Sequence, residues 1–151
     1  MADLLNVGST IPEFETVDQN GNKISSEKLL GKVSVVYFYP KDDTPGCTTE
    51  ACEFRDSMDE YRKNGIEVFG ISVDSEASHK KFVNKYSLNF TLLADKEKRI
   101  SEMFGVLGER SARRVTFIVD REGKIQYVFP KVSPKGHSSE VIQKIRELKL
   151  I

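Results

Sequence analysis

Apolar and polar positions follow two kinds of pattern along this chain, and each kind predicts a different element. Short runs rich in β-branched and aromatic residues, bounded by turn residues, predict buried strands. Stretches with apolar residues every three or four positions predict helices that bury one face. The predicted strands span residues 33–39, 66–73, 90–94, 115–119 and 124–129, and the predicted helices span 26–30, 47–62, 76–86, 96–104 and 139–148.

Two predicted hairpins complete the pattern. Asn20-Gly21 lies between short alternating runs at 14–17 and 23–25, and Asn-Gly is a strong hairpin signal. The second hairpin joins the last two predicted strands. Strands that alternate with helices at these spacings predict crossover connections. We therefore expect an α/β fold with a central mixed β-sheet flanked by helices and with an N-terminal β-hairpin.

The length and charge of the chain limit its class. We expect a single domain over residues 1–151, because 151 residues suffice for one core and no linker or repeat interrupts them. Lys and Arg number 23, as do Asp and Glu, so we expect neither nucleic acid nor an anionic membrane as a partner. The chain start lacks the features of a secretory signal, and no apolar run is long enough to span a membrane. We therefore expect a cytoplasmic protein.

The candidate reactive residues lie at the junction between the predicted strand at 33–39 and the predicted helix at 47–62. The chain has two cysteines, Cys47 and Cys52, and both lie at this junction. The first N–H groups of a helix have no partner within it and favour an anion, so we expect the thiolate of Cys47 to be stabilised. The thiolate is the nucleophilic form of cysteine, which makes Cys47 the first candidate for catalysis.

The spacing of the two cysteines limits what they can do together. Positions five apart on a helix have Cα atoms about 8.6 Å apart, on nearly opposite sides. A disulfide needs about 4.4–6.8 Å, so either the pair never bridges or the first helical turns must unwind. The spacing also differs from the Cys-x-x-Cys of a preformed dithiol motif. We interpret Cys47 as an attacking thiol and Cys52, which we expect to be partly buried, as a resolving thiol.

Metal binding is the weaker interpretation of these cysteines. The chain has two histidines, His79 and His137, and neither lies at a ligand spacing from Cys47 or Cys52. We expect both histidines to be surface residues of helices.

The motif around the first cysteine resembles a known family. The pattern Pro40-x-x-x-Thr44-x-x-Cys47 is similar to the active-site motif of peroxiredoxins. The wider run from 37 to 52 resembles the bacterioferritin comigratory protein, or peroxiredoxin Q, subfamily. The likeness covers nearly the whole chain, including the segments 89–93 and 114–118. The resemblance implies a thioredoxin-like fold and a thiol peroxidase without a metal or organic cofactor.

The resemblance also implies a reaction cycle. Cys47 matches the peroxidatic cysteine, which attacks the O–O bond of a hydroperoxide and becomes a sulfenic acid. Cys52 matches the resolving cysteine, which condenses with that sulfenic acid to a disulfide. Thioredoxin, or a similar dithiol protein, would then restore both thiols. Members of the subfamily are mostly monomers, so a monomer is expected here.

Residues beside Cys47 match the peroxide pocket of the family. The reaction builds charge on the departing oxygen, so fixed donors must point at both peroxide oxygens. Thr44 can supply a hydroxyl, and Gly46 and Cys47 can supply backbone N–H groups. Pro40 would shield the thiolate and, with Pro45 and Gly46, shape the pocket. Thr44 is equally well placed to cap the helix with its side chain.

A cation can hold the thiolate, and the resemblance implies that an arginine does so. Its planar fork can reach sulfur and oxygen together. The loop before the strand at 115–119 is shorter than is usual in the family, so Arg113 and Arg114 both compete for this role. We favour Arg114, because Arg-x-Thr-Phe fits the start of the strand. The short loop also predicts a wider pocket. Glu50 either complements the helix dipole or ties Arg114 in place.

Two other functions are compatible with such a fold. A non-catalytic thioredoxin-like binding or chaperone module is disfavoured by the intact set of Thr44, Cys47 and Arg114. A general thiol–disulfide oxidoreductase is disfavoured by the missing Cys-x-x-Cys motif.

Overall fold

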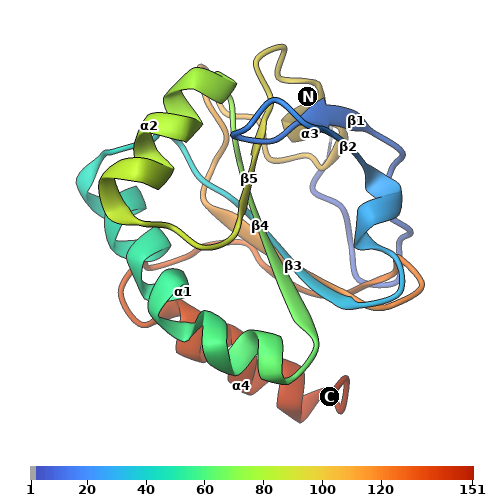
Figure 1. Cartoon of the computed structure of the whole chain (residues 1–151). Helices are drawn as coiled ribbons and strands as arrows, with labels where there is room; N and C mark the ends of the chain where they lie inside the picture. The colour runs from blue at the N-terminus through green and yellow to red at the C-terminus, as the bar shows by residue number, and fades with distance from the viewer. Residues whose placement is uncertain (1–2) are drawn as a thin grey trace.

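The computed structural model describes residues 3–151, so Met1 and Ala2, part of the chain start considered above, lie outside the described residues. It forms a mixed α/β fold, as predicted (Figure 1). The strands are β1 (Glu15–Val17), β2 (Lys23–Ser25), β3 (Val33–Phe38), β4 (Ile66–Ser72), β5 (Thr91–Ala94), β6 (Val115–Val119) and β7 (Ile125–Phe129). The helices are the 3-10 helix η1 (Ser26–Leu29) and the α-helices α1 (Pro45–Lys63), α2 (Glu76–Tyr86), α3 (Arg99–Met103) and α4 (His137–Glu147).

The central sheet has five strands in the order β5-β4-β3-β6-β7. Strand β3 is parallel to β4, and β4 is parallel to β5, whereas β6 is antiparallel to both of its neighbours. The sheet is therefore mixed, which confirms the prediction. Its central strand β3 ends just before the segment that leads to Cys47.

Strand β3 separates two apolar layers. All of its residues are buried, and alternate side chains point to opposite faces. Val35 and Tyr37 pack into the core shared with α1, α2 and α4, whereas Val36 and Phe38 pack into the core shared with α3 and the N-terminal segment. Figure 1 shows α1, α2 and α4 on one side of the sheet and the N-terminal strands on the other.

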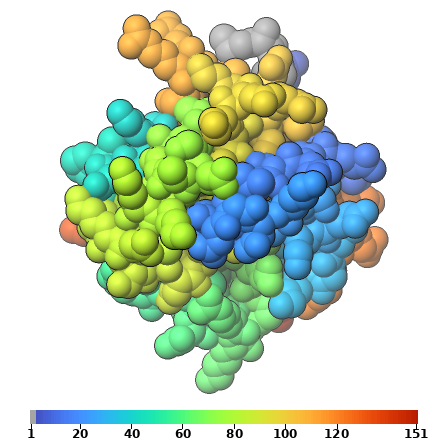
Figure 2. Space-filling view, turned by 45° about the horizontal axis from the view of Figure 1, so that its top comes forward, coloured from blue at the N-terminus to red at the C-terminus, as the bar shows by residue number. Residues whose placement is uncertain are grey.

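The N-terminal hairpin forms as predicted. Strands β1 and β2 pair antiparallel, and Gly21 adopts a positive φ of 79° in the turn, a conformation that favours glycine. Figure 2 shows the hairpin (blue) lying between the α3 segment (yellow) and α2 (yellow-green). The hydroxyl of Thr16 donates to the carbonyl of Ala94, which ties the hairpin to the edge of β5.

Several element boundaries differ from prediction for local reasons. Helix α1 starts at Pro45, two residues early, since proline suits the first helical position. Helix α3 starts at Arg99 instead of residue 96, because the Asp95 carboxylate accepts the backbone N–H groups of Ile100 and Ser101 and fixes a turn before the helix. No helix among residues 3–151 combines the length and apolarity needed to cross a membrane.

The prediction that both histidines lie on the surface was wrong. His79 is fully buried, with Nδ1 2.7 Å from Oδ2 of Asp42 and Nε2 2.9 Å from the carbonyl oxygen of Leu93. His137 is also buried, with Nε2 2.7 Å from the hydroxyl of Thr116. A pattern that counts histidine as polar places it outside, whereas partners for the ring nitrogens allow it to be inside.

Candidate active site

The start of α1 presents Cys47 together with unused backbone donors. Thr44 is the N-cap residue, and Cys47 is the third residue of the helix. The N–H of Thr48 donates to the carbonyl of Thr44 at 2.8 Å, which is the first backbone bond of the helix. The N–H groups of Gly46 and Cys47 precede it and have no acceptor within the helix. They are available for an oxygen atom bound beside the sulfur.

An arginine side chain contacts the sulfur of Cys47. Arg114 lies just before β6, and its Nη2 donates to Sγ of Cys47 at 3.2 Å. Its Nη1 donates to Oε1 of Glu50 at 2.7 Å. The Cys47 residue is 1% exposed and the Glu50 side chain 0%, whereas the Arg114 side chain is 18% exposed. The guanidinium therefore carries positive charge from the surface to a buried sulfur and a buried carboxyl.

Burial changes the acidity of the carboxyl in this group. It raises the pKa of Glu50 to about 7, against the opposing attraction of Arg114. Oxygen Oε2 of Glu50 is buried and has no hydrogen-bond partner among residues 3–151, in keeping with a poorly solvated carboxyl. Near neutral pH, Glu50 is therefore divided between its neutral and charged forms.

The other residues predicted for the pocket differ in their contacts and in how far they are exposed to solvent. Gly46 is in close contact with the arginine, since a Cβ added there would lie 3.2 Å from Nη2 of Arg114 and 3.4 Å from Cγ of Pro134. Pro40 is partly buried, and Pro45 is exposed at the first helical position. Sequence reasoning missed Pro134, which is distant in the chain and carries no motif.

The hydroxyl of Thr44 does not cap the helix. It donates to the carbonyl of Lys41 at 2.8 Å, so one of the two roles expected for this side chain is wrong. The hydroxyl bridges a turn of the preceding loop, and its oxygen keeps its acceptor capacity.

The second cysteine lies further along the same helix. Both thiols are free, and α1 is continuous through Cys47 and Cys52. Cys52 is partly buried, as expected. Burial raises the pKa of the Cys52 thiol, with Arg55 opposing this effect. In the folded helix Cys52 is therefore held as a neutral thiol, which is a poor nucleophile.

The short loop before β6 distinguishes the two candidate arginines. Leu107 and Ala112 form an isolated antiparallel bridge, and the N–H of Gly108 donates to the carbonyl of Ser111 at 2.8 Å. Arg113, which follows Ala112, donates from Nη2 to the carbonyl of Gly105 at 2.7 Å. Arg113 thus secures the turn, and Arg114 is the arginine that lies beside Cys47. The tie between Glu50 and Arg114 considered above is also present.

One group among residues 3–151 has the composition of a metal site. Ligand atoms of Asp42, Asp74 and His79 lie within 4.8 Å of one another. Hydrogen bonds within the group occupy them, since His79 pairs with Asp42, and Asp74 accepts the backbone N–H of Asp42. The group therefore serves to fix the loop before α1. Asp42, which lies between Pro40 and Thr44 of the motif, was the one sequence signal that could have indicated it.

This fold, with a thiol and an arginine at the start of a helix that follows the central strand, defines the class of thiol peroxidases. The profile of the AhpC/TSA family matches residues 7–128, and the chain belongs to that family. It is 43% identical over 149 residues to the putative peroxiredoxin bcp of Coxiella burnetii, covering 93% of this chain and 99% of that protein. It is 40% identical over 151 residues to peroxiredoxin Bcp of Escherichia coli K12, covering 95% and 97%.

Solved structures agree with this assignment. PrxQ of Xylella fastidiosa matches with a TM-score of 0.93 at 26% identity, covering 98% of this chain and 99% of that one. The bacterioferritin comigratory protein of Xanthomonas campestris, whose structure concerns alkyl peroxide reduction, matches with a TM-score of 0.87 at 29% identity, covering 96% and 98%. The chain is thus a thioredoxin-fold thiol peroxidase of the Bcp/peroxiredoxin Q type, as the sequence predicted.

Proposed function

We propose that this chain reduces hydrogen peroxide and organic hydroperoxides by a two-cysteine cycle within one subunit. Cys47 is the peroxidatic residue and Cys52 the resolving residue. The contact between Nη2 of Arg114 and Sγ of Cys47, at 3.2 Å, is the observation that carries the proposal. Alkyl peroxide reduction by the Xanthomonas campestris relative supports the inclusion of organic hydroperoxides.

In the first step the Cys47 thiolate attacks the terminal oxygen of the hydroperoxide. The S–O bond forms as the O–O bond breaks, sulfur is oxidised to a sulfenic acid, and the leaving oxygen takes a proton to become water or an alcohol. Arg114 stabilises the thiolate and the charge that develops on the leaving oxygen. The free N–H groups of Gly46 and Cys47 would donate to the bound peroxide. The hydroxyl of Thr44, whose proton goes to the carbonyl of Lys41, would accept the O–H of the hydroperoxide, with Pro40 and Pro45 bordering the pocket.

In the second step Cys52 attacks the sulfenic sulfur of Cys47. A disulfide forms and the sulfenic oxygen leaves as water, so no further oxidant is needed. Because α1 is continuous through both residues, its first turns must unwind for this step. Glu50 lies between the two cysteines and leaves its contact with Arg114 as the helix opens.

A dithiol protein would then return the pair to thiols by exchange. We propose thioredoxin for this role, acting on a monomer in the cytoplasm, where reducing conditions maintain thiols. The cycle needs no metal or organic cofactor, because the oxidising equivalents of the peroxide end in the disulfide and leave with the reductant.

Rapid mixing of the reduced protein with one equivalent of peroxide tests the proposal. We expect Cys47→Ser to abolish peroxide consumption. We expect Cys52→Ser to keep the first oxidation but to accumulate the sulfenic acid, which a dimedone adduct detects by mass. Equal loss of the first step in both variants would contradict the assigned roles. Reduction of insulin disulfides without peroxide consumption would instead indicate a general oxidoreductase.

A further inference from the structure

Two adjacent aspartates precede the helix that carries Cys47, and the first is held by buried contacts. The Asp42 carboxylate lies 2.7 Å from Nδ1 of His79 and accepts the hydroxyls of Ser78 at 2.8 Å and Tyr39 at 2.6 Å. Its backbone N–H donates to Asp74 at 2.8 Å. These partners come from the residue that follows β3, from α2 and from the loop between β4 and α2. Asp42 is therefore fixed to the body of the protein.

The second aspartate is held differently. Asp43 has a φ of 56°, a left-handed conformation that costs free energy for a residue other than glycine. Its carboxylate accepts the Nζ of Lys85 at 2.8 Å and the hydroxyl of Tyr86 at 2.6 Å. The Asp43 side chain is 40% exposed and that of Lys85 is 59% exposed. Figure 1 shows this loop beside α2, from whose last turn both partners come.

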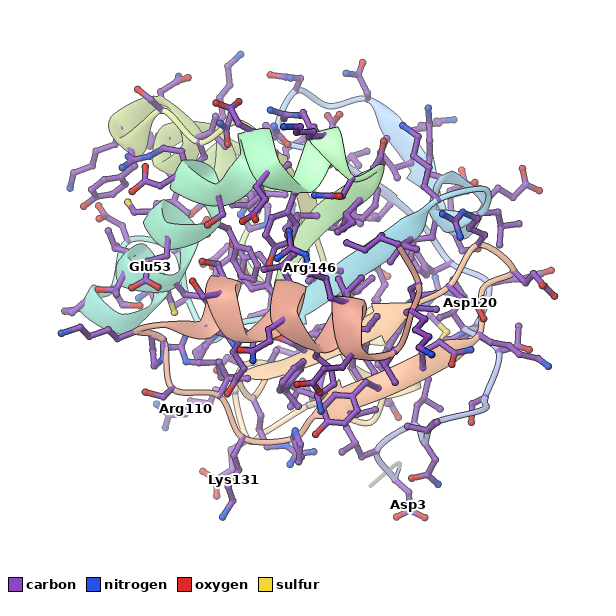
Figure 3. All side chains as sticks on the ribbon, turned by 90° about the horizontal axis from the view of Figure 1, so that it is seen from below. Asp3, Glu53, Arg110, Asp120, Lys131 and Arg146 are labelled. Carbon is purple, nitrogen blue, oxygen red and sulfur yellow. The ribbon has the colours of Figure 1, made fainter. Side chains whose placement is uncertain are left out.

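Beyond Cys52, α1 is tied to its neighbours again. Glu53 accepts the backbone N–H of Gly136 at 2.7 Å, and Figure 3 shows it on α1 facing the segment that leads into α4. Arg55 donates to the carbonyl of Tyr86 at 2.6 Å. Residues 44–52 lie between these ties and Asp43. Among the residues that the structure describes, Arg114 is the one distant residue to which their side chains form hydrogen bonds.

We infer that Asp43, Lys85 and Tyr86 form a latch that must open when the first turns of α1 unwind, and that Asp42 and His79 form an anchor that stays closed. The inference rests on the proposed two-cysteine cycle. Lys85 and Tyr86 are positioning residues that act through Asp43, and they set the rate at which the sulfenic acid of Cys47 meets Cys52.

The division between latch and anchor follows from exposure. Opening the anchor would leave the buried Asp42 carboxylate and His79 ring without partners, which is costly. Opening the latch exposes groups that water already reaches, and it releases Asp43 from its left-handed conformation. The latch therefore contributes a modest barrier, and removing one of its bonds should change a rate by about three- to tenfold.

Single-turnover kinetics test the latch. After one equivalent of peroxide, quenched samples are resolved by mass into sulfenic acid and disulfide. We expect Tyr86→Phe to speed disulfide formation about three- to tenfold, while the first oxidation changes less than about twofold. Lys85→Met should act in the same direction, and Lys85→Arg, which keeps the charge, should stay near wild type.

The matched control is Arg146→Gln. It breaks an exposed ion pair of similar kind, with Arg146 Nη2 2.9 Å from Oε2 of Glu60, at the other end of α1 (Figure 3). We expect no change in either rate. A second readout uses the wild type, since high salt should weaken the exposed Lys85–Asp43 pair and speed disulfide formation, with no such effect in Asp43→Asn.

The possible failures are distinct. If the wild type forms its disulfide but Tyr86→Phe and high salt leave the rate unchanged, the latch is overturned and the two-cysteine cycle stands. If the wild type forms no disulfide within the chain, both proposals are overturned. A Tyr86→Phe variant that slows disulfide formation would also overturn the latch, because it would mean that the contact promotes opening.

Discussion

The two halves of helix α1 are held in place by different means. In the N-terminal half, Cys47 and Glu50 are buried polar groups that share one partner, Arg114. In the C-terminal half, Phe54, Met58 and Tyr61 pack into the apolar core against β3 and α4. Cys47 and Ala51 also reach that core, but the buried polar groups of the first half depend on one charge, whereas the buried side chains of the second half are mainly apolar.

This difference teaches how one helix can be both rigid and reactive. Stability varies along a structure, and segments with few buried apolar contacts open first. In the proposed cycle, oxidation of the reactive Cys47 thiolate to a neutral sulfenic acid would weaken the contact with Arg114. In that cycle the half that opens is thus the half whose contact the chemistry weakens, while Phe54, Met58 and Tyr61 keep the other half packed in the core.

The largest expected effect comes from removing that charge. Arg114→Met should slow oxidation of Cys47 by about 10²–10³-fold, because a preorganised donor to the developing charge is lost. Stopped-flow measurement of thiol loss against peroxide concentration gives the rate. The matched control is Arg113→Met, which loses a contact with the carbonyl of Gly105 and should stay within about fivefold. Equal effects of the two variants would contradict the role of Arg114.

The next effect concerns Glu50 and pH. Its pKa is about 7 in the folded protein, above the value of about 4.3 for an exposed glutamate. Between these values the folded state keeps a proton that the unfolded state has lost, so this contribution to wild-type stability falls as the pH rises. Since glutamine does not titrate, the free energy of unfolding of Glu50→Gln minus that of wild type should rise by up to about 3 kcal/mol between about pH 4.5 and 7.5.

Denaturant unfolding across this pH range measures the difference. Glu60→Gln is the control, since Glu60 is an exposed residue of the same helix and its curve should run parallel to that of wild type. A Glu50→Gln curve that also runs parallel would show that the carboxyl is already charged when folded.

The smallest effect concerns the apolar half. The hydroxyl of Tyr61 donates to the carbonyl of Ser138 at 2.5 Å, so Tyr61→Phe removes one hydrogen bond from a carbonyl that also accepts within the backbone ladder of α4. We expect a loss of about 0.5–1.5 kcal/mol in the free energy of unfolding, measured by denaturant titration. The rate of Cys47 oxidation should not change. A variant that oxidises more slowly would mean that the two halves of α1 are coupled before the reaction.

Most of the fold follows from sequence periodicity. Apolar spacing predicted the face of α1 formed by Phe54, Met58 and Tyr61, and β-branched runs predicted the strands, because burial of such residues dominates the free energy of folding. Element ends were less predictable. The start of α3 depends on the Asp95 carboxylate, a contact that no periodic pattern records.

The candidate site was predictable only in part. The motif identified Cys47 and the strand start indicated Arg114, but His79 was placed on the surface, because its partner Asp42 lies 37 positions away in the chain. The latch between Asp43 and Tyr86 likewise joins segments that are separate in sequence. Such contacts depend on how α2 packs beside the loop, which hydrophobic patterning alone does not determine.

The N-terminal hairpin has a consequence for how the protein meets other copies of itself. The outer edge of β5 would present free backbone groups to a further strand, which is a route to aggregation. The hairpin occupies these groups, since Oε1 of Gln19 accepts the N–H of Leu92 at 3.0 Å and Asp18 forms a bridge with Leu93. The N-terminal hairpin thereby prevents this edge of the sheet from pairing with strands of other molecules.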